Sequence, residues 1–154
     1  MIDWGNPHCK ISNYFSVGEA IYLPSWNRLA NINDGLNDDA KNSLLFMFQK
    51  MDQIRELLNV PIIVHVAFRS VAYNCLVKGA LNSSHIARAT NIAAVDFHPL
   101  LEADNQVEKC NLGRAIIMPD LEYLGLRMEN GDNNPWIHLD CHPLPNGGSR
   151  FFKP

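Results

Sequence analysis

The chain has 154 residues, enough for one domain built around a single hydrophobic core. Hydrophobic residues make up 47% of it and charged residues 19%, which is an ordinary globular composition. The net charge of −3 argues against a nucleic-acid-binding protein, and no apolar run approaches the roughly 20 residues that membrane insertion requires.

The first third of the chain divides into an irregular segment and a long helix. It begins MIDWGNPHCK, without the basic start and apolar run of a signal peptide, so we expect synthesis in the cytoplasm. Residues 1–36 are expected to wrap the core as loops, with one helical turn at Val17–Ile21. Asn37–Leu58 is predicted to be a helix. Its apolar stripe should face the core and consists of Leu44, Leu45, Met47, Phe48, Met51, Ile54 and Leu57.

The rest of the chain predicts short strands and two helical regions. Segments rich in β-branched or alternating apolar residues are predicted strands: 62–70, 91–99, 125–131 and 135–143. Residues 70–80 predict a short helix ending at Gly79, and Asn105–Gly125 a longer one that Pro119 kinks or splits. The tail from Leu144 is expected to be a loop whose aromatic residues pack on the sheet.

Because helices and strands are segregated, the order favours one α+β domain over residues 1–154. We expect a small, mostly antiparallel sheet of about four strands packed with helices. Residues 37–154 would form the functional core, and residues 1–36 would wrap around it.

Histidines and acids gather on two of the predicted strands. Alternate side chains of a strand share a face, so Asp96 and His98 lie together. The same holds for Trp136, His138, Asp140 and His142. If the two strands share a sheet, Asp96 and His138 converge, and the loop before Asp96 carries His85 to the same point.

The environment of Asp96 favours a bound cation. This carboxylate stands in the apolar run AAVDF, where burial without a partner is costly. Two imidazoles, one carboxylate and an open fourth position are what a catalytic zinc ion needs. Spacing alone also allows the alternatives of core or surface histidines.

Four ordered motifs extend this pattern over nearly the whole chain: FRSVAYN at 68–74, SSH at 83–85, AVD at 94–96 and WIHLD at 136–140. With them the chain resembles the zinc D-Ala-D-Ala carboxypeptidase and L-alanyl-D-glutamate endopeptidase family, whose fold is shared with the Hedgehog signalling domain. The segment VGEAIYLPSW is similar to the opening of members encoded by bacteriophages. Many members are phage lysins that cut the peptides of bacterial cell walls.

The resemblance implies a role for each matching residue. His85, Asp96 and His138 would be the Zn²⁺ ligands. Arg69 would bind a substrate carboxylate or carbonyl oxygen and stabilise the developing oxyanion, because a guanidinium donates two parallel hydrogen bonds. Two further residues would support the ligands by hydrogen bonds: Ser83 and Asp140. A surface salt bridge is the alternative for Asp140, and a solvated strand end for Arg69.

The sequence departs from the family pattern at two places. The spacing between His85 and Asp96 is about four residues longer than in the family, and the glycine of that segment is missing. His98 is therefore an alternative ligand. Pro135 stands where the family has its general base, three residues before His138. We expect Asp132 to act as base instead, followed by Glu129 and Asp140.

The predicted function is hydrolysis of peptidoglycan stem peptides by a zinc peptidase, at D-Ala-D-Ala or at L-Ala-D-Glu bonds. The protein would be phage-encoded and act in the host cell or on a virion. One alternative is a catalytically inactive metal-binding or cell-wall-binding module of the same fold. Another is a thiol hydrolase that uses Cys75 or Cys141, although a buried packing role fits the helical Cys75 better. The wide spacing of the cysteines predicts reduced thiols, with a disulfide as the alternative that their even number allows.

Overall fold

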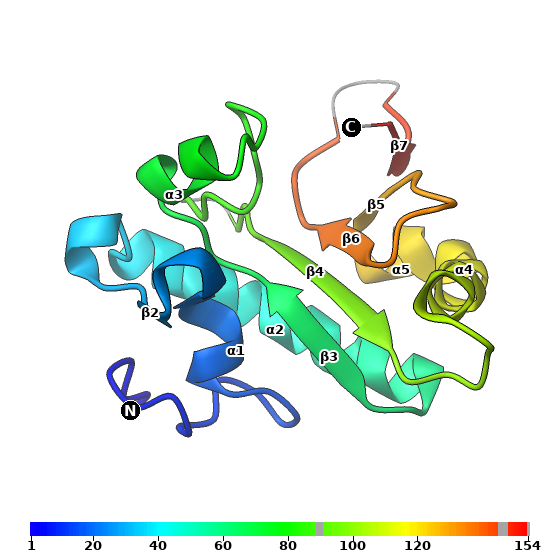
Figure 1. The fold of residues 1–154 in the computed structure, drawn as a ribbon, viewed down its shortest axis with the longest axis horizontal. Coiled ribbons are helices and arrows are strands. Elements are labelled where there is room, and N and C mark those ends of the chain that lie inside the picture. The colour runs from blue at the N-terminus through cyan, green and yellow to red at the C-terminus, as the bar shows by residue number, and fades with distance from the viewer. Residues whose placement is uncertain (89–90, 145–147, 154) are drawn as a thin grey trace.

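The computed structural model describes residues 1–88, 91–144 and 148–153, and a five-stranded sheet lies at its centre (Figure 1). The strands are β3 (Ile62–Val66), β4 (Ala94–Pro99), β5 (Arg127–Glu129), β6 (Ile137–Asp140) and β7 (Phe151–Phe152). They lie in the order β3-β4-β6-β5-β7, and all neighbours are antiparallel except β5 and β7. The α+β prediction is confirmed. The fifth strand, β7, comes from the tail, which was expected to be a loop. Residues 145–147 and 154 of the tail lie outside the described part.

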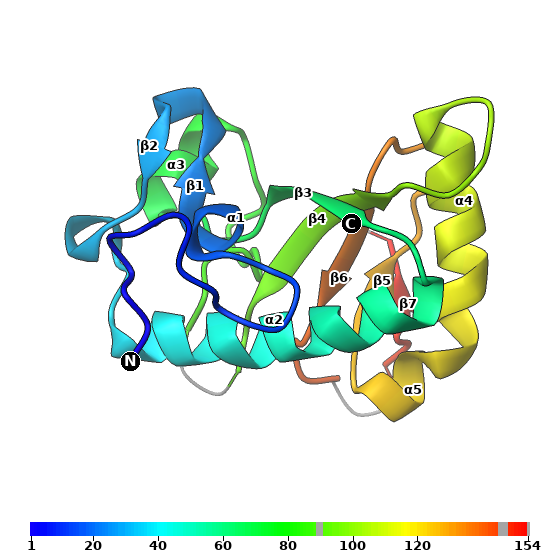
Figure 2. The same ribbon diagram turned by 90° about the horizontal axis from the view of Figure 1, so that it is seen from below.

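Helices cover one face and one end of this sheet, as Figure 2 shows. The helices are α1 (Val17–Ile21), α2 (Asp38–Leu58), α3 (Val71–Leu76), α4 (Gln106–Ile117) and α5 (Leu121–Leu124). Short 3-10 turns lie at Pro24–Trp26, Ile32–Asp34 and Met118–Asp120. The long α2 runs beneath β3 and β4, and α4 lies at the far end of the sheet. No helix of the described residues is both long and apolar enough to cross a membrane.

The predicted long helix is confirmed as α2. Asn37 caps its start, with the side chain accepting a hydrogen bond from the Ala40 amide. Most of the apolar stripe is fully buried against the sheet: Leu44, Met47, Phe48, Met51 and Ile54. Leu57 was expected in the core but is 38% exposed, because it lies on the solvent side of the last turn.

Pro119 splits the second helical region, as the sequence predicted. Helix α4 ends at Ile117, a 3-10 turn covers Met118–Asp120, and α5 follows as a single turn. Proline has no amide hydrogen and its ring crowds the preceding turn, so a continuous α-helix is interrupted there.

The segment between β3 and α3 differs from its prediction. Strand β3 ends at Val66 after a bulge at His65, and residues 67–69 leave the sheet. Ser70 caps α3, which ends at Leu76, three residues before the expected Gly79. Cys75 is exposed on this helix, so the expectation that it packs in the core is wrong.

The wrapping segment is more ordered than expected. Besides α1 it contains a two-stranded sheet of β1 (Tyr22–Leu23) and β2 (Arg28–Leu29). Asp52 of α2 is 93% buried and anchors the preceding loop. Its carboxylate accepts hydrogen bonds from the hydroxyl of Ser12 at 2.8 Å and from the amides of Asn13 and Tyr14 at 2.9 and 3.2 Å.

Asp52→Ala is expected to lower the free energy of unfolding by about 2–4 kcal/mol, because it leaves these donors without their charged acceptor. The measurement is urea unfolding followed by circular dichroism. Gln53→Ala, at the neighbouring exposed position, is the matched control and should change stability by less than about 0.5 kcal/mol. An equal loss of unfolding free energy in the two variants would show that the hydrogen bonds of Asp52 contribute nothing specific to stability.

Candidate metal centre

The pairing of β4 with β6 brings the first two candidate residues together. In this antiparallel ladder Asp96 stands directly opposite His138. Side chains of directly opposed residues on one face are neighbours. Nδ1 of His138 lies 2.7 Å from Oδ1 of Asp96, so the convergence predicted from strand periodicity is confirmed.

His85 reaches the same point through two backbone contacts with the segment that leaves β3. Its carbonyl accepts a hydrogen bond from the Arg69 amide at 2.8 Å. Its ring Nδ1 lies 2.6 Å from the carbonyl oxygen of Ala67, which can only accept, so Nδ1 carries the proton. The hydroxyl of Ser83 accepts a hydrogen bond from the His85 amide at 3.3 Å. Ser83 therefore supports the backbone of His85.

His85 lies beside Asp96 and His138 even though its spacing from Asp96 in the sequence is long. Arg88 and Ile92 form an isolated antiparallel bridge within the longer segment. Residues 89–90, between them, lie outside the described part. Ser43 of α2 donates to the Arg88 carbonyl, and the Cys141 thiol contacts the Asn91 carbonyl. Arg88 and Asn91, on the two sides of the residues that lie outside the described part, are thus both held by neighbouring elements.

The contact between His85 and Asp96 favours a bound cation. Nε2 of His85 lies 3.1 Å from Oδ1 of Asp96, but it makes no hydrogen bond within the described part of the chain. Since Nδ1 holds the proton of a neutral ring, Nε2 presents a lone pair to a carboxylate oxygen. Two acceptors this close repel each other unless a proton or a metal ion lies between them.

The three side chains fit a metal ion. One ligand atom each from His85, Asp96 and His138 lies within 4.8 Å of the others. Two imidazole nitrogens and one carboxylate oxygen are a donor set of catalytic zinc sites, where a fourth position stays open. The carbonyl of Ala67 fixes the tautomer of His85, as such partners do for ligand histidines.

The ionisation of these groups in the metal-free protein suits cation binding. Burial lowers the pKa of His85, which keeps its ring neutral. Burial acts to raise the pKa of Asp96, but the hydrogen bond from the protonated His138 brings it well below its ordinary value. Burial acts to lower the pKa of His138, but hydrogen bonds with Asp140 and Asp96 raise it to about 9. A metal ion must therefore displace a proton from His138.

This raised pKa predicts how the stability of the metal-free protein depends on pH. The folded state holds the His138 proton more tightly than the unfolded state, so the stabilisation is fully present below pH 6.5 and is lost as the pH rises through 9. We expect the unfolding free energy to fall by about 2 kcal/mol between pH 7 and 9.5. Urea titrations with chelator present measure it, and His138→Gln should remove most of the fall.

Asp140 is held beside His138 by a buried ion pair. Its carboxylate is 99% buried and accepts two hydrogen bonds from Arg127, both at 2.8 Å. It also lies 3.4 Å from Nε2 of His138 and accepts a bond from the hydroxyl of Ser84 at 3.3 Å. Burial acts to raise the pKa of Asp140, but Arg127 lowers it. Asp140 is thus no surface salt bridge, and the sequence offered no signal for Arg127 as its partner.

Arg69 adjoins the candidate metal group. One terminal nitrogen lies 3.2 Å from Oδ2 of Asp96, and the side chain is 17% exposed. Its Nε is buried without a hydrogen-bond partner among the described residues. The guanidinium therefore keeps an unused donor.

A cleft of about 470 Å³ opens over the group. Arg69, Trp136 and Phe152 line it together with the three candidate ligands. Glu129, at the end of β5, also lines it, whereas Asp132 is exposed on the following turn and is absent from the lining. Of these two candidate bases, Glu129 lines the cleft and Asp132 does not.

The remaining predicted groups lie apart from this cluster. Nδ1 of His98 is 2.6 Å from Nε2 of His65, and the ring centres are 4.9 Å apart, so the nitrogens point at each other. His98 is therefore engaged by His65. All four cysteines are free thiols. Burial raises the pKa of Cys141 to about 11, which makes it a poor nucleophile at neutral pH.

A family model described as peptidase M15 matches residues 26–140, about three quarters of the chain. The match contains all three side chains of the candidate metal group. No curated protein matches the chain, and no solved structure does.

Proposed function

The chain belongs to the peptidase M15 family, and on that basis we propose that it is a zinc peptidase that hydrolyses peptidoglycan stem peptides. The observation that carries the proposal is Nε2 of His85, which is buried without a hydrogen-bond partner among the described residues and lies 3.1 Å from the carboxylate of Asp96. A buried arrangement of this kind is stable when a cation joins the two groups. The motifs shared with wall-cutting phage enzymes support the substrate class and a phage-encoded member that acts in the host or on a virion.

His85, Asp96 and His138 would hold the zinc ion. When bound, zinc acts as a Lewis acid towards the scissile carbonyl and lowers the pKa of a water molecule in its open position. Asp140 and the Ala67 carbonyl would keep the two imidazoles in their orientation.

Arg69 would hold the substrate. Its side chain lines the cleft and is 17% exposed, so the guanidinium can donate to the carbonyl oxygen of the scissile amide, where negative charge develops. Its hydrogen bond to Asp96 would hold the guanidinium beside the carbonyl carbon of the scissile amide.

We assign the general base to Glu129, which replaces our sequence-based expectation of Asp132. Glu129 lines the cleft, and its carboxylate lies 3.4 Å from the side-chain nitrogen of Asn134. A carboxylate in this position can accept the proton of the attacking water and return it to the leaving amine. Pro135 occupies the family's usual base position but cannot take a proton.

Metal analysis combined with a digestion assay tests the function. The purified protein should hold about one zinc ion and release peptides from purified peptidoglycan. A chelator should stop hydrolysis, zinc should restore it, and thiol alkylation should leave it unchanged. Bound zinc without hydrolysis would favour the alternative of an inactive binding module, and hydrolysis that survives the chelator would exclude the zinc mechanism.

A further inference from the structure

The cleft is lined by more cationic side chains than those paired with the carboxylates around the metal group. Its lining includes four cationic side chains, Arg69, Lys78, Arg127 and Lys153, against three carboxylates. Arg69 pairs with Asp96, and Arg127 pairs with Asp140. Lys78 and Lys153 form no ion pair with any residue in 1–88, 91–144 and 148–153.

Lys78 stands at a backbone position that glycine would fill at lower cost. It follows α3 with a φ of 56°, in the left-handed region. Helices commonly end with glycine in this conformation, and here Gly79 is the next residue. Asn74 fixes the turn by donating to the Ala80 carbonyl at 2.9 Å. A strained lysine on a fixed turn at the cleft is a reason to look for a role of its ammonium group.

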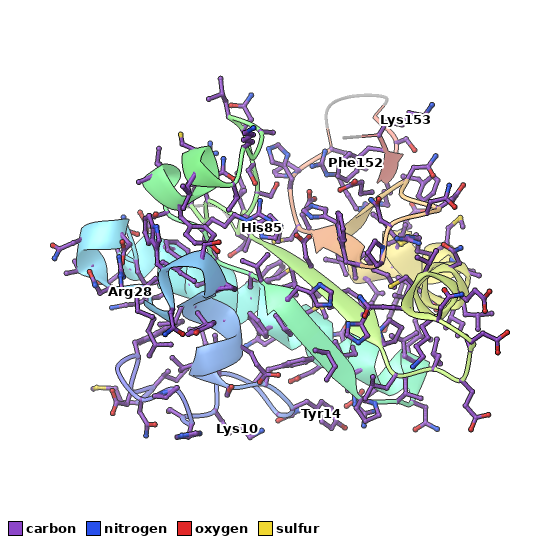
Figure 3. The ribbon with its side chains drawn as sticks, viewed as in Figure 1. Lys10, Tyr14, Arg28, His85, Phe152 and Lys153 are labelled. Carbon is purple, nitrogen blue, oxygen red and sulfur yellow. The ribbon has the colours of Figure 1, made fainter. Side chains whose placement is uncertain are left out.

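Lys153 is held at the cleft by the strand before it. β7 pairs in parallel with β5, which places Phe152 on the guanidinium of Arg127 at 4.4 Å and against the ring of His138 at 6.0 Å. In Figure 3, Phe152 and Lys153 lie on the β7 side, across from His85. Both residues lie outside the matched range 26–140.

We propose that Lys78 and Lys153 form a carboxylate-reading pair, one on each side of the metal group, which selects peptides with free carboxylates flanking the scissile amide. In Figure 1, α3 lies to the upper left and β7 to the upper right of β4 and β6, the strands that carry Asp96 and His138. A peptide crossing the metal group from one wall to the other passes both ammonium groups. This inference rests on the proposed function and deepens it.

The expected preference is for stem peptides whose carboxylates are free. Amidation of a carboxylate keeps its size but removes its charge, so a lysine that reads this group loses most of its contribution. The long, flexible lysine side chain suits carboxylates whose exact position varies between substrates.

The test compares synthetic stem peptides, with free or singly amidated carboxylates, as substrates of the zinc-loaded enzyme. We expect amidation to lower kcat/KM about tenfold for the wild type. Lys78→Gln and Lys153→Gln should each lower kcat/KM for the free peptide to a similar degree. In each variant, amidation of the carboxylate that the replaced lysine binds in the wild type should leave kcat/KM unchanged. Lys50→Gln, on α2 beneath the sheet, is the matched control and should behave as the wild type.

Calorimetric binding of the same peptides to the metal-free protein gives a readout that does not depend on turnover. The affinities should follow the same pattern. If all enzymes hydrolyse free and amidated peptides equally, the inference is wrong while the proposed function stands. If the wild type hydrolyses none of them but binds in the expected pattern, the proposed function fails and the charge reading remains.

Discussion

His138→Ala is expected to abolish stoichiometric zinc binding and to lower peptidoglycan hydrolysis by about 1,000-fold or more. The change removes one of three side chains whose ligand atoms lie within 4.8 Å of one another. The Lewis-acid role of zinc contributes several kcal/mol to such a reaction, and two remaining ligands do not retain the ion at low concentration. Zinc content by mass spectrometry and initial hydrolysis rates are the measurements.

His98→Ala provides the matched control for this change. His98 is two residues from Asp96 on the same strand, but its ring contacts His65. It should keep about one zinc ion and most of the activity. Circular dichroism and thermal unfolding distinguish loss of a metal ligand from misfolding. Asp96→Asn, which keeps the size of the side chain, should lose zinc as well. Zinc retained by His138→Ala but lost from His98→Ala would refute the assigned ligand set.

Glu129→Gln is expected to lower kcat by about 10²–10⁴-fold while zinc stays bound. The amide fills the same space in the cleft but accepts no proton at neutral pH. Because Glu129 is no member of the metal group, metal content and the unfolding midpoint should change little. Steady-state hydrolysis of a defined stem peptide is the measurement.

Asp132→Asn is the comparison for Glu129→Gln. Asp132 is exposed and outside the cleft lining, so this variant should keep activity within about twofold of the wild type. The reverse outcome, a large loss in Asp132→Asn and a small one in Glu129→Gln, would return the base to the turn that precedes Pro135. Equal, small losses would show that neither carboxylate takes the proton.

Local sequence patterns were sufficient for much of the fold. Helix α2 was predictable because one face of a long helix must be apolar, and its start was readable from the polar residue at Asn37. The break at Pro119 follows from the chemistry of a single residue. The meeting of Asp96 with His138 followed from the two-residue period of strands, once the two strands were assumed to be neighbours.

Contacts between distant segments decided the rest. Nothing near Asp140 in the sequence identifies Arg127 as its partner, and nothing near His85 identifies the Ala67 carbonyl that fixes its tautomer. The tail became a strand because β5 offered an unpaired edge, an opportunity that local propensity does not report. For the same reason the choice between Asp132 and Glu129 was not available from spacing.

The sequence by itself determined the donor types at the centre, the faces of the strands that carry them and the family to which the chain belongs. Only the tertiary structure decided that His85 turns Nε2 towards Asp96, that Glu129 and not Asp132 lines the cleft, and that Lys153 joins its wall. The physical reason is that residue type and periodicity fix the direction of a side chain relative to its own backbone. Its partners depend on how separate segments pack.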